Sequence, residues 1–256
     1  MRDSLSQEDG LKVDEPPVVL LLHPIGQDAT CWRWLKLEGV GVRLVAPDLP
    51  GHGSCPRRAT SLRKFADEAV SAVAGTFDLV GVAMGGMVAQ HVLLQCPTRV
   101  RSAVLICTHG SSDRKVCEER ARAAERWGMG PVVASTLKRW FTPEALGQPQ
   151  HPGVAYARER LLAMDHHAYA DAWRAMGDHQ VLDALGTVGC PVTVVAGSRD
   201  ASVPLVELER LHRRIPGSRL EVIDAPHMAH LERPELVTAA IVRHLAWVAE
   251  SKSGGL

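Results

Sequence analysis

Three points of the 256-residue chain carry the residues best suited to chemistry: a strand-to-helix turn, then an acid, then a base. The turn is Gly81-Val82-Ala83-Met84-Gly85-Gly86, between a short apolar run and a helical pattern. Small residues around position 83 are typical of a turn that strains its central residue and projects that side chain over a sheet edge. Asp200 and His227 each follow a predicted strand, so a carboxylate can orient an imidazole beside the turn. These residue types predict a site for acyl transfer.

The nucleophile position of this turn is occupied by alanine. The pattern G-x-S-x-G places a serine where the chain has Ala83, and a methyl group cannot attack a carbonyl. Three interpretations stay open. In the one we favour, the chain is a Ser→Ala variant of a hydrolase, because the acid and the base are still in place. In the second, the protein naturally lacks the nucleophile and uses the His227–Asp200 dyad as a general base in lyase, cyclase or cofactor-free oxygenase chemistry. In the third, it is a ligand-binding receptor on the same scaffold.

The elements that must position these residues alternate between strands and helices. Short, uniformly apolar runs predict buried strands, and apolar residues at helical spacing predict the helices between them. This alternation indicates an α/β protein with a doubly wound, mostly parallel sheet. The strands are expected over 17–23, 42–49, 77–82, 102–107, 190–196 and 220–223, and the helices over 62–74, 84–95, 205–215 and 234–249.

The alternation stops between Cys107 and Cys190. That segment predicts only helices, over 115–127, 132–140, 154–164 and 167–176. We therefore expect a core formed by residues 1–108 and 187–256, with a helical cap at 109–186 inserted after a central strand. Such a cap would cover the carboxyl edge of the sheet, where open α/β folds bind ligands.

Five motifs in chain order carry a family resemblance. The chain resembles the α/β-hydrolases, and within them the 3-oxoadipate enol-lactonase-like group of small esterases and lactonases. The sequence departs from the family pattern at Ala83, and it has Pro24 and Pro226 where glycine is commoner. The motifs are His23-Pro24-Ile25-Gly26, Asp48-Leu49-Pro50-Gly51-His52-Gly53, Arg139-Trp140-Phe141-Thr142-Pro143, Gly197-Ser198-Arg199-Asp200 with Val203-Pro204, and Ala225-Pro226-His227 with Glu232-Arg233-Pro234-Glu235.

A catalytic assignment follows from these motifs. Ala83 marks the nucleophile serine position, His227 is the expected base and Asp200 the acid that orients it. Backbone N–H groups of Ile25 and Met84 are expected to form an oxyanion hole. The predicted substrate-binding residues are His23, Pro24, Trp140 and Trp127.

Some of these assignments have competitors. His230, three residues after His227, is the main alternative base. Trp140 can line the pocket or attach the cap to the core. Cap aspartates are expected to face water; they are Asp165, Asp178 and Asp183.

The predicted substrate is a small carboxylic ester or lactone, and no metal or organic cofactor is required. Because enol-lactonase substrates carry a carboxylate, one cationic cap residue is a candidate to bind such a group, while most cap arginines are expected to face water. The candidates are Arg114, Arg120, Arg122, Arg126, Arg139, Arg158, Arg160, His166 and His167. Most of the tryptophans also fall near the predicted pocket, which indicates an aromatic lining: Trp32, Trp34, Trp127, Trp140 and Trp173.

The composition excludes several other classes of protein. Lys and Arg number 29, as do Asp and Glu, so the chain lacks the basic excess of a nucleic-acid-binding protein. No apolar run approaches the ~18 residues of a membrane span, and the polar segment 1–14 is unlike a secretory signal. The six cysteines form no C-x-x-C pair and are expected to be free thiols. We therefore expect a soluble cytoplasmic protein; the sequence does not indicate its oligomeric state.

Overall fold

A parallel sheet forms the centre of the computed structural model, which describes residues 16–253. Within these residues the sheet has six strands in the order β2-β1-β3-β4-β5-β6, and all of the pairings are parallel. Gly81 pairs with Leu22 on one side and with Leu105 on the other, so the carboxyl ends of three central strands meet. The strands are β1 (Val18–Leu22), β2 (Arg43–Val45), β3 (Phe77–Val82), β4 (Val100–Ile106), β5 (Val192–Gly197) and β6 (Arg219–Ile223).

The burial of each strand follows its place in the sheet. Every residue of β1, β3 and β5 is buried, as expected for strands covered on both faces. The edge strand β2 is partly exposed and shorter than the predicted strand over 42–49. The chain leaves the sheet early because the Asp48 carboxylate accepts hydrogen bonds from the backbone N–H groups of Ala29 and Ser54.

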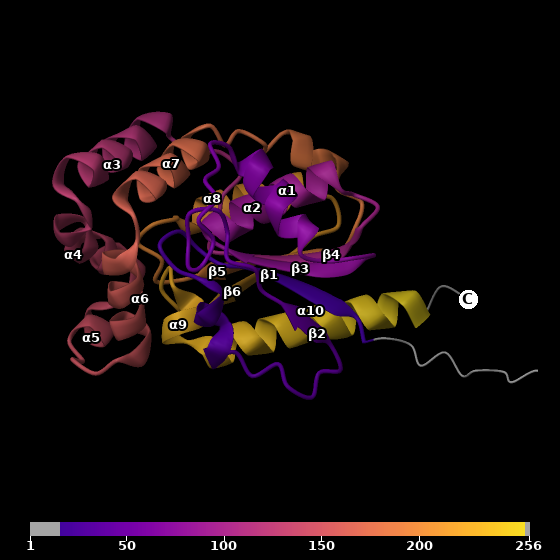
Figure 1. Cartoon of the computed structure of the whole chain (residues 1–256). Helices are drawn as coiled ribbons and strands as arrows, with labels where there is room; N and C mark the ends of the chain where they lie inside the picture. The colour runs from indigo at the N-terminus through magenta and orange to yellow at the C-terminus, as the bar shows by residue number, and fades with distance from the viewer. Residues whose placement is uncertain (1–15, 254–256) are drawn as a thin grey trace, which may run out of the picture.

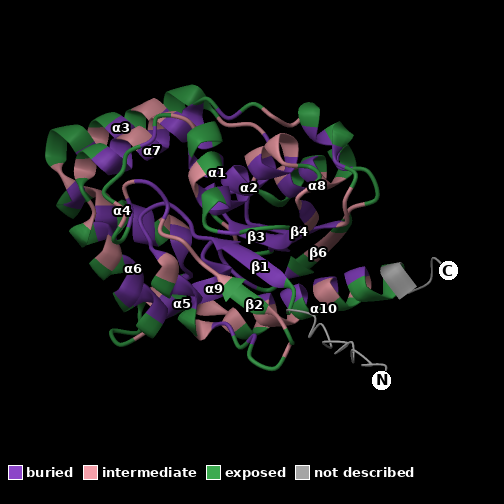
Figure 2. Cartoon of the chain, turned by 45° about the vertical axis from the view of Figure 1, so that its right-hand side comes forward, coloured by how far each residue is buried: buried purple, intermediate pink, exposed green. Residues whose placement is uncertain are grey.

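Helices cover both faces of the sheet. Helices α1 (Leu62–Ser71), α2 (Met84–Gln95) and α8 (Leu205–Arg214) lie on one face, and α10 (Pro234–Ser253) lies on the other (Figure 1). The buried residues concentrate in the strands and on the inward sides of the helices (Figure 2). Shorter helical segments that the periodicity did not predict are η1 (Ala29–Trp34), η2 (Ala184–Thr187) and α9 (Ala229–Glu232).

A group of helices lies between β4 and β5 at the carboxyl end of the sheet (Figure 1). Its longest helices match the four predicted there. The short α5 was not predicted; Thr142 caps it and Pro143 begins it, a local signal that helical periodicity does not detect. The division into core and cap at residues 109 and 186 remains a prediction. The helices are α3 (Arg114–Trp127), α4 (Met129–Trp140), α5 (Pro143–Leu146), α6 (Pro152–Ala163) and α7 (His166–Gly177).

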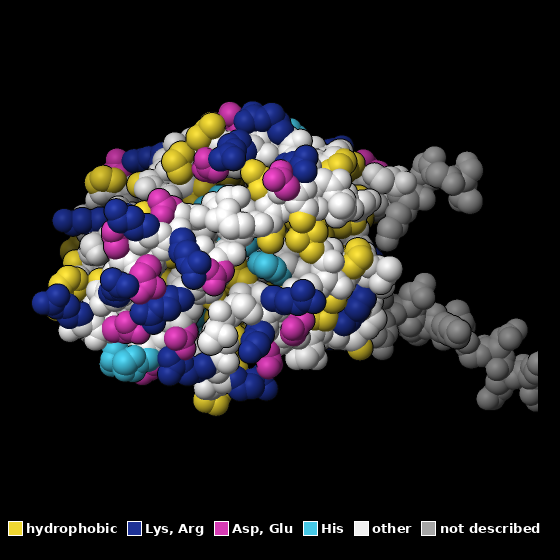
Figure 3. Space-filling model, turned by 90° about the horizontal axis from the view of Figure 1, so that it is seen from above, with side chains coloured by type: hydrophobic (Ala, Val, Ile, Leu, Met, Phe, Trp, Pro, Cys, Tyr) yellow, Lys and Arg dark blue, Asp and Glu magenta, His cyan; other side chains and the backbone are white. Residues whose placement is uncertain are grey.

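The surface and the cysteines agree with the composition. Basic and acidic side chains are interspersed on the face shown in Figure 3. All six cysteines are free, as predicted; Cys31, Cys107 and Cys117 are buried. Within residues 16–253, no helix combines the length and apolar character needed to cross a bilayer. The predicted polar segment 1–14 lies outside the described residues.

Candidate active site

The turn between β3 and α2 has the strained backbone expected of a nucleophile turn. Ala83 has φ 50° and ψ −115°, a conformation that residues with a side chain seldom adopt. The peptide is held on two sides, because Ala83 N–H donates to the Ile106 carbonyl at 3.0 Å and Thr108 Oγ1 donates to the Ala83 carbonyl at 2.9 Å. The turn therefore presents side chain 83 at the end of β3 in a fixed direction.

Glycines make this turn possible. A Cβ on Gly85 would lie 2.0 Å from the Leu22 carbonyl oxygen, and one on Gly81 would lie 2.3 Å from the Gly85 carbonyl oxygen. Only the absence of a side chain allows β1, β3 and the start of α2 to approach this closely.

The predicted acid and base are in contact. His227 Nδ1 lies 2.8 Å from Asp200 Oδ2, and both side chains are almost completely buried. Burial alone would raise the pKa of Asp200, but the nearby His227 charge and hydrogen bonds from the Ser202 and Val203 amides outweigh it, so the pKa lies below its usual value. An ionised carboxylate can thus accept from Nδ1–H and leave Nε2 as the proton acceptor.

Both predicted oxyanion donors are close to Ala83: Met84 follows it in the chain, and Ile25 shares its cavity. Met84 is the first residue of α2, where helical N–H groups have no partner within the helix and the dipole favours negative charge. Ile25 lines the same cavity as Ala83. Gly26 follows with φ 71°, and a Cβ there would lie 2.5 Å from the Leu161 side chain of α6. The loop that carries Ile25 is therefore held closely against the helical segment.

The segment between α4 and α5 joins the acid and base loops to the cap helices. Thr142 contacts the Glu232 carboxylate through both its backbone N–H and its hydroxyl, at 3.0 and 2.6 Å. Met228 N–H donates to the Trp140 carbonyl at 3.0 Å, and Ser202 Oγ donates to the Arg139 carbonyl at 3.2 Å. These hydrogen bonds thus hold the residues next to Asp200 and His227 to the end of α4 and the start of α5.

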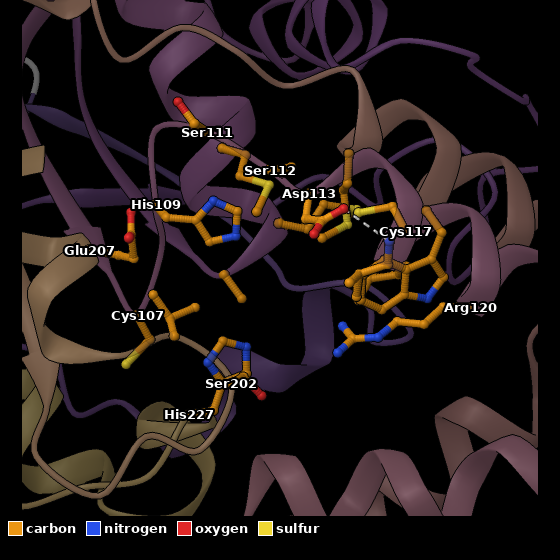
Figure 4. Close-up of a pocket in the computed structure, with 18 of the residues that line it drawn as sticks. Cys107, His109, Ser111, Ser112, Asp113, Cys117, Arg120, Ser202, Glu207 and His227 are labelled. Carbon is orange, nitrogen blue, oxygen red and sulfur yellow. Dashed lines mark hydrogen bonds between the residues drawn. The ribbon is translucent and has the colours of Figure 1, made fainter. Parts of the chain in front are cut away.

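A cavity of about 240 Å³ lies where these parts meet. It brings together Ala83, Met84, Ile25 and His227 with Trp140 and Trp173 from the helical segment. Figure 4 shows that His109, Arg120 and His227 all point into this space. Its composition, mostly apolar with a few converging polar groups, is typical of a small-molecule site.

Several predicted site residues lie elsewhere. Trp127, a predicted substrate-binding residue, does not line the cavity: its side chain is 59% exposed at the end of α3, with Arg126 stacked over it. His23 and Pro24 do not line the cavity. His23 is fully buried, its Nε2 accepts from Leu49 N–H at 2.9 Å and its Nδ1 lies 2.8 Å from the Pro24 carbonyl. His23 instead stabilises the loop that carries it. The sequence did not show this, because the spacing of residues does not reveal which side of a loop faces a cavity.

The competing base is placed away from the cavity. His230 is fully buried; its Nε2 contacts Gln27 Oε1 at 3.0 Å and its ring packs on Trp32. Burial lowers its pKa to about 3, so it stays neutral. Trp32 and Trp34 are also outside the cavity, so the predicted aromatic lining consists of Trp140 and Trp173.

The cap cations separate into one cavity residue and several surface residues. Arg120 lines the cavity with its guanidinium 4.5 Å from the centre of the Trp173 ring, and no carboxylate partner is seen for it within residues 16–253. Arg114, Arg122 and Arg160 pair with carboxylates, and His166 and His167 stack on each other. The cap aspartates face water, as expected; in these exposed positions Asp165 caps α7, Asp178 pairs with Arg114 and Asp183 with Arg214.

Sequence reasoning missed other residues of the cavity. His109 lies in the loop after β4, at the same sheet edge as Asp200 and His227, and that position was the available signal. Ser202 and Glu207 enter from the segment after β5. Cys107 contributes a thiol, but burial and then the Asp200 charge raise its pKa well above the usual value, so it does not supply a thiolate at neutral pH.

The fold and this site define an α/β-hydrolase, and residues 19–240 match the model of the Alpha/beta hydrolase family; the chain belongs to that family. It is 29% identical over 249 residues, 89% of this chain and 98% of the other, to a pimeloyl-[acyl-carrier protein] methyl ester esterase of Aromatoleum aromaticum. It is 27% identical over 237 residues, 87% of this chain and 86% of the other, to 3-oxoadipate enol-lactonase 1 of Acinetobacter baylyi. A thermophilic esterase from Thermogutta terrifontis has the same fold, with a TM-score of 0.81, 28% identity and coverage of 91% of this chain and 90% of the other. The expected likeness to enol-lactonases is thus shared with ester-cleaving relatives, and none of these likenesses concerns the alanine at position 83.

Proposed function

We propose that the chain carries the site of a carboxylic ester or lactone hydrolase in which Ala83 occupies the position of the nucleophilic serine. The contact between His227 and Asp200, 2.8 Å long and next to a nucleophile turn with intact geometry, is the observation that carries this proposal. The ester and lactone chemistry named for the relatives supports it. In the sequence as given, the site would hold a substrate and turn it over slowly, if at all.

The proposed mechanism gives each group a defined role, and His227 acts in both halves of the reaction. With serine at position 83, His227 Nε2 takes the hydroxyl proton while the oxygen attacks the substrate carbonyl, and Asp200 stabilises the imidazolium. The Ile25 and Met84 N–H groups bind the oxyanion. His227 then passes its proton to the leaving oxygen, and water, activated by the same imidazole, hydrolyses the acyl-enzyme. No metal or cofactor is needed.

We also propose that the substrate is small and carries a carboxylate directed at Arg120. This guanidinium is held over Trp173 at the cavity wall without an acidic partner among the described residues. A charged, planar donor set of this kind suits a carboxylate. The apolar part of the lining, including Trp140 and Met87, suits an apolar or cyclic body, although the carboxylates of Asp113 and Glu207 also line the cavity.

The test compares the chain as given with Ala83→Ser, using 4-nitrophenyl butyrate and measuring kcat/KM. We expect Ala83→Ser to gain about 10³-fold or more, the scale lost when a nucleophile is removed. The control is Ala83→Ser combined with His227→Ala, which should lose the gain.

Two outcomes would replace the proposal. Activity already present in the chain, unchanged by Ala83→Ser and lost in His227→Ala, would establish the dyad as a general base acting without residue 83. Tight binding of esters with no turnover in either form would establish a receptor.

A further inference from the structure

His109 sits on a loop whose backbone is fixed from two sides. Its carbonyl accepts from Gln90 Nε2 of α2 at 3.1 Å and lies 3.0 Å from His179 Nε2. One residue on, the Gly110 carbonyl accepts from the backbone N–H groups of Val181 and Leu182, both at 3.0 Å. The loop therefore holds the His109 ring in a set direction before any ligand arrives.

The ring direction is into the cavity. Figure 4 shows His109 and His227 pointing into the same space from different sides, and both line it together with Ala83. The two imidazoles differ in what contacts their Nδ1 atoms. His227 has the Asp200 carboxylate on its Nδ1, whereas the Nδ1 of His109 is buried in its own loop, where the Ser111 backbone interacts with the ring.

The charges around His109 decide which kind of oxygen it suits. Burial lowers its pKa and the His227 charge lowers it further, while Glu207 of α8, a hydrogen bond with the Ser111 backbone and Asp200 oppose both effects without reversing them. His179, which packs against it, is itself held neutral. The ring is therefore uncharged at neutral pH, with one donor nitrogen and one acceptor nitrogen. Such a ring matches a hydroxyl group, which can both donate and accept, better than a carboxylate.

We propose that His109 is a substrate-binding residue that hydrogen-bonds a hydroxyl group, so that the site takes hydroxylated esters or lactones. The ester part of this statement rests on the proposed function. His109 would bind the hydroxyl on the side of the cavity formed by the loop after β4, away from the wall formed by Arg120 on Trp173.

The test measures binding without turnover, in the chain as given. Methyl benzoate is compared with methyl 2-, 3- and 4-hydroxybenzoate by isothermal titration. We expect at least one hydroxylated isomer to bind about tenfold more tightly than methyl benzoate, because a site built to bind a hydroxyl discriminates against the analogue without it. His109→Phe should abolish this preference, and His109→Gln, which keeps a donor and an acceptor, should retain part of it.

Controls separate a binding role from a structural one. His167→Phe replaces an exposed histidine of α7 outside the cavity and should leave the preference unchanged. In the unsubstituted chain, the His109 ring resonances in ¹⁵N-correlated spectra should shift with the preferred isomer and not with methyl benzoate. Equal affinity for all four esters, or a preference that survives in folded His109→Phe, would overturn the proposal. Because no turnover is measured, failure of Ala83→Ser to hydrolyse esters would reject the proposed function and leave this result standing.

Discussion

Ala83 keeps a strained backbone although its side chain has no functional group to project. Positive-φ strain of this kind costs roughly 1–3 kcal/mol and persists where the surroundings impose it. Here the imposing contacts are the hydrogen bonds to the Ile106 carbonyl and from Thr108. Position 83 therefore retains the backbone geometry of a nucleophile turn although it lacks a nucleophilic side chain.

The charge of Arg120 provides the prediction at this scale. In the Ala83→Ser background, Arg120→Gln should lower kcat/KM for 4-nitrophenyl hydrogen succinate about tenfold or more and change that for neutral 4-nitrophenyl butyrate little, because only the anionic ester loses a charge-assisted hydrogen bond. Arg126→Gln, at a guanidinium stacked on the exposed Trp127, is the matched control and should change neither value. An equal loss for both esters would show that Arg120 does not recognise the carboxylate.

At the scale of the element, the β3–turn–α2 unit depends on close approach of backbones. Gly81 and Gly85 let the turn pack against β1 and against itself at distances that no Cβ tolerates. The helix that follows is buried through most of its length, so it cannot move away to relieve a clash. The position of Met84 N–H, and with it the proposed oxyanion hole, is set by these two glycines.

Gly85→Ala should therefore destabilise the protein by about 3 kcal/mol or more, since the new methyl would lie 2.0 Å from the Leu22 carbonyl oxygen. Urea unfolding followed by circular dichroism measures this change. Gly130→Ala in α4 is the matched control: a Cβ there meets nothing within 4 Å, and alanine should stabilise by up to about 1 kcal/mol through its helix propensity. Similar effects of the two substitutions would show that the turn can relax.

At the scale of the whole molecule, folding buries an unusual set of neutral imidazoles. His52, His179 and His230 are buried, and burial lowers the pKa of each to about 3. In the unfolded chain these rings take up protons near their ordinary pKa of about 6.5. The unfolded state therefore binds more protons between about pH 6.5 and pH 3, and stability must fall as the pH falls through that window.

His230→Gln should reduce this pH dependence. Below pH 6.5, the free energy of unfolding should change less steeply with pH when one such ring is removed. The slope should fall by up to about 1.4 kcal/mol per pH unit. Urea titrations at pH 7, 6, 5 and 4 measure the slope. His167→Gln, at an exposed ring, should leave it unchanged. If His230→Gln keeps the full slope, His230 is not held neutral by burial.

The parallel α/β architecture, the helical segment after β4, and the chain order of turn, acid and base could be predicted from the amino-acid sequence. These features depend on local patterns: apolar runs for strands buried on both faces, glycines at a tight turn, and polar residues that directly follow strands. Since parallel strands end at a common edge, residues so placed had to come near one another, and His227 and Asp200 are indeed 2.8 Å apart.

Which side chains face the cavity could not be predicted in this way. Trp140 and Trp173 line it while Trp127 faces water, although all three lie on similar amphipathic helices. Arg120 enters it while the other cap arginines do not, and His109 joins it from a loop that the sequence assigned to the cap. The physical reason is that helical periodicity defines an apolar face for each helix, whereas its orientation over the sheet depends on packing against the other helices. The hydrogen bonds that hold Thr142, Trp140 and Arg139 to the acid and base loops set that orientation here.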